Sequence, residues 1–249
     1  MKNTLFTGLA VLTLLGLPTS HSAEPGTAAS SQPQTAQKQS QDWADLGRYR
    51  QENENLRPPA EGENRVVFMG DSITDFWGRA PGTSFFPVKP YINRGISGQT
   101  TPQMLVRFMP DVVALKPKVV VILAGTNDIA GNTGPMTLRD TENNFMAMTD
   151  IARQNGIVRV VLSSLTPAFQ YPWRPAIQPV EKISALNAWL KDYATKNGLV
   201  YLDYYSKMVD AKGGMKAGLS HDGVHPNRAG YAIMAPTAEK AIQQALAKS

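Results

Sequence analysis

A serine and a histidine that are far apart in the chain could together carry out nucleophilic chemistry. Ser72 directly follows a short apolar run, and His225 lies three residues after Asp222. A serine hydroxyl is a weak nucleophile until a base removes its proton, and histidine is the usual base near neutral pH. A turn between Asp222 and His225 would aim both side chains at one place, where the carboxylate could orient the imidazole. The alternative is that Ser72 merely caps a helix.

The chain offers few other candidates for a base or a metal ligand. It has three histidines, His21, His221 and His225, and no cysteine. The lack of cysteine excludes disulfides, thiolate metal sites and a cysteine nucleophile. His221 and His225 have a spacing that could hold a metal ion on a helix, but the nearby Gly223 and Pro226 disfavour a helix there. We therefore expect no metal and no cofactor, with His221 at the surface or behind the site.

Two further segments could stabilise negative charge on a reacting carbonyl oxygen. Asn127 follows an apolar, β-branched run, and its side-chain amide is a strong neutral donor for an oxyanion. Gly98 lies in a loop that enters a predicted helix, so its backbone N–H could be a second donor. Each segment also has an ordinary structural interpretation, a helix cap for Asn127 and a tight turn for Gly98.

Apolar runs and helical patterns alternate along the chain and surround these residues. The predicted strands are 66–69, 91–93, 119–124, 157–165 and 199–203, and the predicted helices are 104–115, 138–155, 180–196 and 227–247. This alternation predicts an α/β fold with a mainly parallel sheet covered by helices on both faces. Ligands of such sheets bind beyond the carboxyl ends of the strands, where the polar segments described above are expected.

The first 41 residues have the composition of a leader and a linker. Residues 1–23 contain Lys2 and the apolar run 5–17, which is typical of a signal peptide and shorter than the roughly 20 apolar residues of a membrane span. Residues 24–41 are rich in Ser, Gln, Ala, Thr and Pro, which predicts a disordered linker. We expect an exported, periplasmic or extracellular protein without a stable membrane anchor after signal cleavage; an uncleaved anchor is the alternative.

The remaining residues are predicted to form a helical extension, 42–64, and one domain, 65–249. In the extension, Trp43, Leu46 and Tyr49 share one face of a helix that would pack on the domain. The formal net charge of the 249-residue chain is +5, but lysines and arginines are scattered singly, so we expect no nucleic-acid partner. The sequence leaves the oligomeric state open.

Four of these segments, in this order, resemble the SGNH (GDSL-type) hydrolase family. The four blocks are Gly70-Asp71-Ser72-Ile73, with isoleucine where the commonest pattern has leucine; Ser97-Gly98-Gln99-Thr100; Gly125-Thr126-Asn127-Asp128; and Asp222-Gly223-Val224-His225. The resemblance covers about residues 65–245.

The resemblance implies a flavodoxin-like three-layer α/β/α sandwich with a five-stranded sheet of order 2-1-3-4-5. It implies Ser72 as nucleophile, His225 as base and Asp222 as the residue that orients His225. The implied oxyanion donors are the backbone N–H groups of Ser72 and Gly98 and the side chain of Asn127. The implied reaction is ester hydrolysis through an acyl-enzyme.

The substrate is less well defined by the sequence. Residues 93–101 are similar to members resembling platelet-activating-factor acetylhydrolase subunits, which favour short acyl groups. Phe169, Tyr171 and Trp173 lie on a proline-rich segment and could stack on a sugar or aryl ring, or simply pack the loop. We expect a short-chain, acetyl esterase acting on a carbohydrate or other extracellular alcohol. The alternatives are a lysophospholipase or thioesterase, an acyltransferase, and a non-catalytic carbohydrate-binding envelope protein.

Overall fold

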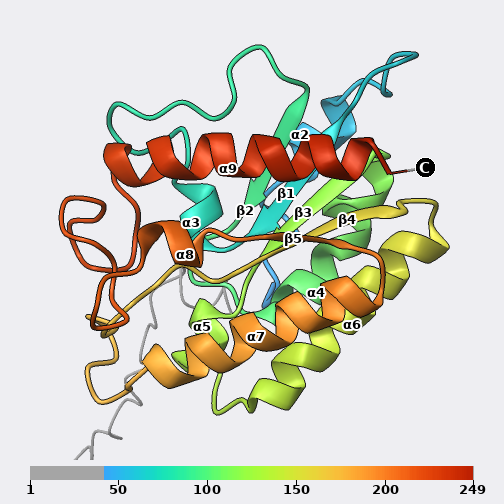
Figure 1. The fold of residues 1–249 in the computed structure, drawn as a ribbon. Helices are drawn as coiled ribbons and strands as arrows, with labels where there is room; N and C mark the ends of the chain where they lie inside the picture. The colour runs from blue at the N-terminus through green and yellow to red at the C-terminus, as the bar shows by residue number, and fades with distance from the viewer. Residues whose placement is uncertain (1–41, 249) are drawn as a thin grey trace, which may run out of the picture.

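Five short segments form one parallel sheet in the computed structural model, which describes residues 42–248 (Figure 1). The strands are β1 (Val66–Gly70), β2 (Tyr91–Gly95), β3 (Val119–Leu123), β4 (Arg159–Ser163) and β5 (Val200–Leu202). Their order, β2-β1-β3-β4-β5, confirms the predicted topology. All five predicted strands exist, although β4 is shorter than the predicted 157–165. The predicted signal peptide and linker lie outside the described residues.

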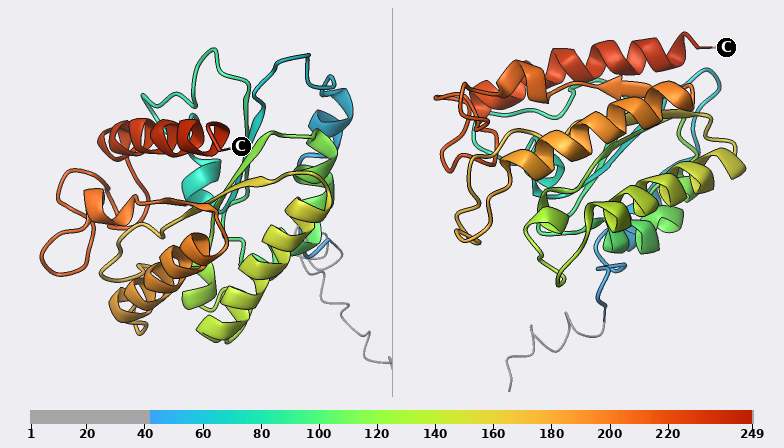
Figure 2. Two further views of the ribbon diagram at one scale, coloured as in Figure 1. Left: turned by 45° about the vertical axis from the view of Figure 1, so that its right-hand side comes forward. Right: turned by 60° about the horizontal axis from the view of Figure 1, so that its bottom comes forward.

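Helices cover both faces of the sheet (Figure 2). One face carries α4 (Thr101–Asp111), α6 (Leu138–Gln154) and α7 (Val180–Lys196), and the other carries α9 (Arg228–Leu246). Successive strand residues point to opposite faces, so Val67 and Met69 contact the first layer while Val66 and Phe68 contact the second. Because both faces are buried, the central strands read as continuous apolar runs in the sequence.

The long helices agree with the prediction to within one residue, except at α4. The structure begins α4 at Thr101 rather than at residue 104, because Thr100 and Gln103 form a capping box at its N-terminus. A 3-10 turn, η1 (Val113–Leu115), replaces its predicted last turn. Three one-turn helices stand beside the predicted long ones: α3 (Ser72–Asp75), α5 (Thr126–Ile129) and α8 (Tyr205–Met208). No helix within residues 42–248 is long and apolar enough to cross a membrane.

The prediction of a helix starting at residue 42 is wrong. Residues 42–49 form turns, and α2 spans only Arg50–Asn55. The Asp42 carboxylate accepts the N–H groups of Leu46 and Gly47 at 2.8 Å each, and Asp45 adopts a left-handed φ of 53°. These local bonds offer the backbone an alternative to the helix.

The extension nevertheless contacts the domain near the end of β2. Tyr49 is buried, and its hydroxyl donates to the Gly95 carbonyl. The Ala44 carbonyl accepts from the side chain of Gln99 at 2.8 Å. The Arg94 guanidinium lies over the Tyr49 ring, 4.5 Å from its centroid. Residues 42–64 therefore support the loop that follows β2.

Two glycines let α3 sit directly on the ends of β1 and β2. A Cβ atom on Gly70 would lie 2.1 Å from Thr74 Oγ1, and one on Gly95 would lie 2.2 Å from the Asp75 backbone nitrogen. A side chain at either position would push α3 away from the sheet. The close approach fixes the position of Ser72, the first residue of α3.

Candidate active site

Strand β1 and its two neighbours, β2 and β3, end at the same level, which brings the polar segments after them together. Gly70 of β1 pairs with Gly95 of β2 and with Leu123 of β3. Ser72 begins α3 just beyond this level, and Asn127 lies in α5 just beyond β3. The candidate site therefore lies at the carboxyl edge of the sheet, as expected for a parallel α/β fold.

Ser72, His225 and Asp222 form a continuous hydrogen-bonded chain. Ser72 Oγ lies 2.8 Å from His225 Nε2, and His225 Nδ1 lies 2.6 Å from Asp222 Oδ2. An ionised carboxylate can only accept, so Nδ1 must carry the hydrogen of that bond. In the neutral ring this leaves Nε2 as an acceptor facing the serine hydroxyl. The geometry is that of a nucleophile paired with an oriented base.

The turn that holds Asp222 and His225 is organised by the aspartate itself. Asp222 Oδ1 accepts the N–H groups of Val224 and His225 at 2.9 and 2.8 Å, and the Ser220 hydroxyl at 3.0 Å. Gly223 takes a left-handed φ of 81°, which the tight turn requires. Partial burial alone would raise the pKa of Asp222, but hydrogen bonds from His225 and from these backbone N–H groups lower it overall. The carboxylate is therefore ionised at neutral pH.

Aromatic rings flank the histidine. The ring centroid of His225 lies 5.3 Å from that of Phe76 and 6.0 Å from that of Trp173. Of the three loop aromatics singled out from the sequence, Tyr171 is fully buried and stacks on Trp173, which is 37% exposed, while Phe169 is 61% exposed. Tyr171 thus packs the loop, and Trp173 presents a ring beside His225.

The two other predicted donor positions lie in neighbouring loops. Asn127 is buried; its Nδ2 donates to the Gln99 carbonyl at 3.0 Å, and its Oδ1 accepts from Asn132 at 2.8 Å. One of the two amide hydrogens of Asn127 is thereby used, and the second makes no hydrogen bond to another described residue. Gly98 has a left-handed φ of 81°, and an added Cβ there would meet nothing within 4 Å. The N–H of Ser72 lies at the start of α3, where a helix leaves its first N–H groups unpaired.

A buried arginine that the sequence analysis missed connects the end of β1, which precedes Ser72, to the end of β2 and the loop that contains Gly98. Arg107 of α4 is fully buried and donates to the carbonyls of Gly70 and Arg94 at 3.0 and 2.8 Å. It also contacts Gln99 Oε1 at 2.5 Å and Asp111 Oδ2 at 3.1 Å. Burial lowers its pKa, while Asp111 opposes this change. Arg107 thus holds the ends of β1 and β2 and the loop of the second block.

A buried carboxylate likewise holds the segment 125–128, the third sequence block, against a neighbouring helix. Asp128 accepts the Thr101 N–H at 3.1 Å and the Thr101 hydroxyl, and so joins α5 to the first turn of α4. Burial raises its pKa, which these hydrogen bonds partly offset.

A second buried carboxyl adjoins the candidate nucleophile. Asp71 caps α3: its Oδ1 accepts the Ile73 N–H at 2.9 Å. Its Oδ2 has no hydrogen-bond partner among the described residues. Burial raises the pKa of Asp71 from 3.8 to about 7.

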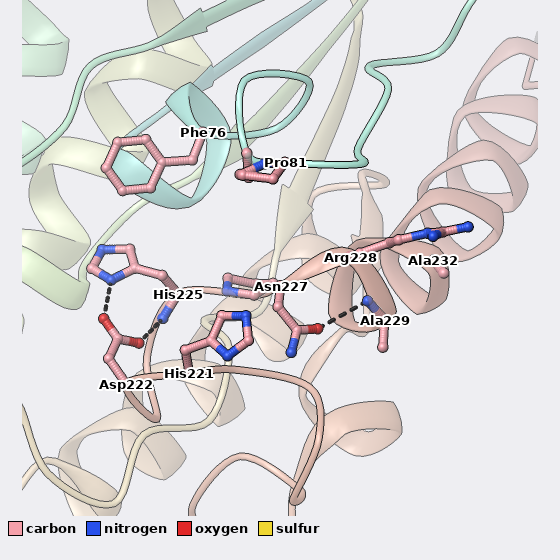
Figure 3. A pocket seen from close by; sticks show the side chains of 11 residues that line it. Phe76, Pro81, His221, Asp222, His225, Asn227, Arg228, Ala229 and Ala232 are labelled. Atoms are coloured by element: carbon pink, nitrogen blue, oxygen red, sulfur yellow. Dashed lines mark hydrogen bonds and ion pairs between the residues drawn. The ribbon is translucent and has the colours of Figure 1, made fainter.

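A cavity of about 700 Å³ opens beside the histidine, on the side of α9 (Figure 3). Phe76 and Pro81 form an apolar wall, and His221, Asn227 and Arg228 contribute polar groups. His221 is exposed at this cavity, in keeping with the expectation of a surface position. Within residues 42–248, no group of three or more His, Asp or Glu side chains could hold a metal ion.

Comparison with known proteins identifies the family. Residues 68–233 match the GDSL-like lipase/acylhydrolase family. A GDSL-like lipase from Bacteroides thetaiotaomicron VPI-5482 is 43% identical, with a TM-score of 0.78 and coverage of 82% of this chain and 99% of that one. A Bacteroides fragilis NCTC 9343 protein assigned as an acylhydrolase is 44% identical, also with a TM-score of 0.78, over 82% of this chain and 98% of that one.

A more distant structure shares the fold. An acetylxylan esterase from Geobacillus stearothermophilus is 21% identical, with a TM-score of 0.57, over 75% of this chain and 95% of that one. No curated protein matches the chain. The chain belongs to the GDSL-like lipase/acylhydrolase family, a family of carboxylic ester hydrolases.

The raised pKa of Asp71 predicts a specific pH dependence of stability. The folded state holds the Asp71 proton more tightly than the unfolded chain does, so this carboxyl destabilises the fold as pH rises from 3.8 to about 7. Asp71→Asn keeps an oxygen for the Ile73 N–H but cannot ionise. We expect the difference in melting temperature, Asp71→Asn minus wild type, to increase as the pH is raised from about 4 to about 8.

The matched control is Asp150→Asn, which removes an exposed carboxylate from α6. Its melting temperature relative to wild type should change much less over the same range. If the difference in melting temperature between Asp71→Asn and wild type stays constant with pH, the raised pKa of the buried Asp71 carboxyl is contradicted.

Proposed function

We propose that this acylhydrolase cleaves short-chain esters, acetyl esters above all, of a carbohydrate or similar alcohol, through an acyl-enzyme on Ser72. The observation that carries the proposal is the chain from Ser72 Oγ to His225 Nε2, at 2.8 Å, and from His225 Nδ1 to Asp222 Oδ2, at 2.6 Å. A nucleophile, a base and an orienting carboxylate are the parts that serine-dependent acyl transfer needs.

The first half of the reaction forms the acyl-enzyme. His225 Nε2 takes the Ser72 proton as Oγ forms a bond to the ester carbonyl carbon, and the carbonyl π electrons move to its oxygen. When this tetrahedral intermediate collapses, the bond to the alcohol oxygen breaks, and the alcohol leaves with the proton from His225. The ionised Asp222 stabilises the imidazolium while it carries that proton.

The second half releases the acid. A water molecule gives a proton to His225 as its oxygen attacks the acyl carbon. The bond between that carbon and Ser72 Oγ then breaks, and His225 returns its proton to the serine. Both tetrahedral intermediates carry negative charge on the former carbonyl oxygen, for which we propose three donors: the N–H groups of Ser72 and Gly98 and the free amide hydrogen of Asn127.

The surroundings of the histidine support a small acyl group and a larger alcohol. Ser72 is 6% exposed and Phe76 and Trp173 flank His225, so a carbonyl group reaches the hydroxyl through a confined opening. The cavity of about 700 Å³ beside His225 offers room for the alcohol part, with apolar walls and polar groups from Asn227 and Arg228. Aromatic rings combined with hydrogen-bonding groups suit the recognition of sugars.

Export is part of the proposal. The positively charged start and apolar run of residues 1–23 support secretion to the periplasm or beyond. An esterase acting on extracellular carbohydrate would need such a route.

Removal of the nucleophile or of the side-chain oxyanion donor should mainly affect turnover. We expect Ser72→Ala to abolish measurable hydrolysis of p-nitrophenyl acetate, and Asn127→Ala to lower kcat by roughly 10²–10³. Steady-state kinetics on purified protein, with thermal unfolding to verify the fold, measures both. Ser206→Ala, an exposed serine of α8, is the matched control and should behave as wild type. Wild-type turnover by Ser72→Ala would refute the assigned nucleophile.

The preferred acyl length separates the proposal from the lysophospholipase and thioesterase alternatives. We expect kcat/KM to be highest for p-nitrophenyl acetate and to fall through butyrate to octanoate, because the confined opening disfavours long chains. Release of acetate from acetylated oligosaccharides would extend the result to the alcohol part. A kcat/KM that rises with chain length would argue for a lipid or thioester substrate instead, and transfer of the acetyl group to a hydroxyl of an added sugar would argue for an acyltransferase.

A further inference from the structure

The side chain of Asn132 connects three loops of the candidate site. Its Nδ2 donates to Asn127 Oδ1 at 2.8 Å and to the Gly98 carbonyl at 3.2 Å. Its Oδ1 accepts the indole N–H of Trp173 at 3.1 Å. Its own backbone N–H donates to the Asn127 carbonyl at 3.0 Å, which fixes the turn after α5. The Asn132 amide therefore contacts three loops. Two of them carry the proposed oxyanion donors Asn127 and Gly98, and the third carries Trp173 beside His225.

The partners of this amide leave it only one orientation. An indole N–H can only donate and a backbone carbonyl can only accept. Trp173 thus requires the oxygen of Asn132, and the Gly98 carbonyl requires its nitrogen. A flip of the Asn132 amide would place its nitrogen against the indole N–H and its oxygen against the Gly98 carbonyl, and both hydrogen bonds would be lost.

The fixed orientation of Asn132 in turn holds the amide of Asn127. Because Asn132 presents its nitrogen, Asn127 must present its oxygen to it, which leaves the Asn127 nitrogen to face the Gln99 carbonyl and the site. Each of these groups is buried or partly buried, where an unmatched donor or acceptor is costly. A flipped Asn127 would direct a carbonyl oxygen, rather than an N–H, at a reacting oxyanion.

We propose that Asn132 is a positioning residue: together with the Trp173 indole N–H, it keeps the nitrogen of Asn127 turned toward the oxyanion. The inference rests on the proposed function, because it assigns Asn132 a role only through Asn127. Asn132 also connects the Trp173 ring beside His225 to Asn127. A substrate that displaces the Trp173 ring would remove the indole N–H that holds the Asn132 amide in its orientation.

The test compares variants in two backgrounds, wild type and Asn127→Ala. Asn132→Asp keeps the shape but replaces the donor by a second acceptor, so it cannot satisfy Asn127 Oδ1 or the Gly98 carbonyl. We expect it to lower kcat on p-nitrophenyl acetate by about tenfold or more, with little change in KM. Trp173→Phe keeps a ring but removes the N–H donor, and should lower kcat in the same direction by a smaller factor.

In the Asn127→Ala background the same two substitutions should cause a much smaller further loss of kcat, because the amide they orient is absent and only the contact of Asn132 with the Gly98 carbonyl remains to be disturbed. Asn143→Asp, an exposed position on α6, controls for the added charge and should leave kcat unchanged in both backgrounds. Thermal unfolding of each variant verifies the fold. If Asn132→Asp does not fold, Trp173→Phe in the two backgrounds provides the same comparison.

The possible failures are distinguishable. Unchanged kcat in Asn132→Asp and Trp173→Phe, or losses of equal size in both backgrounds, would overturn the positioning role and leave the proposed function intact. Unchanged kcat in Asn127→Ala itself would remove the oxyanion donor on which both proposals depend. A loss of kcat in the wild-type background alone, with KM preserved, supports the proposal that Trp173 and Asn132 together orient Asn127.

Discussion

The hydrogen bond between Ser72 Oγ and His225 Nε2, 2.8 Å long, is the contact on which the rest of the site depends. It joins the end of the first strand to the turn before the last helix, so it exists only if the whole sheet is assembled between them. Two features bring its partners together. α3 sits on the ends of β1 and β2 because Gly70 and Gly95 have no side chains, and α9 is held against α3 by the Tyr231 hydroxyl, which donates to the Ile73 carbonyl at 2.8 Å. The geometry of the candidate site is thus a consequence of the topology and not of any one loop.

Buried charges hold the loops around that contact. The buried ion pair of Arg107 with Asp111 adds little to stability, because the cost of removing its charges from water is comparable to their mutual attraction. Arg107 and Asp128 instead serve as multiple hydrogen-bond partners, Arg107 for the ends of β1 and β2 and Asp128 for Thr101. Loss of either would leave carbonyl or N–H groups unpaired in the interior, so their contribution is to the placement of the loops. Asn132 extends the same arrangement outward, with neutral groups, to the ring of Trp173.

Local apolar patterns predicted the strands and the long helices, and the family resemblance carried by four ordered motifs implied the strand order and the roles of Ser72, Asp222 and His225. The same reasoning failed at three places, one through local hydrogen bonds and two through contacts between distant parts of the chain. The helix predicted from residue 42 is lost to hydrogen bonds of Asp42, although its apolar spacing is regular. Arg107 gave a signal that was overlooked: it lies on the apolar face of α4 between Met104 and Phe108, where a charge needs buried partners. Asn132 gave none, because its role depends on the Trp173 loop, which is distant in sequence and meets it only in the folded chain.

The central claim is that His225 activates Ser72, and the rate of covalent labelling measures this directly. A fluorophosphonate reacts with an activated serine hydroxyl without needing a matched substrate, so it reports on the serine and its base apart from substrate specificity. Peptide mapping by mass spectrometry after labelling should place a single adduct on Ser72, and labelling of His225→Ala should be slower by several orders of magnitude. An adduct on another residue, or equal labelling rates with and without the imidazole, would contradict the account.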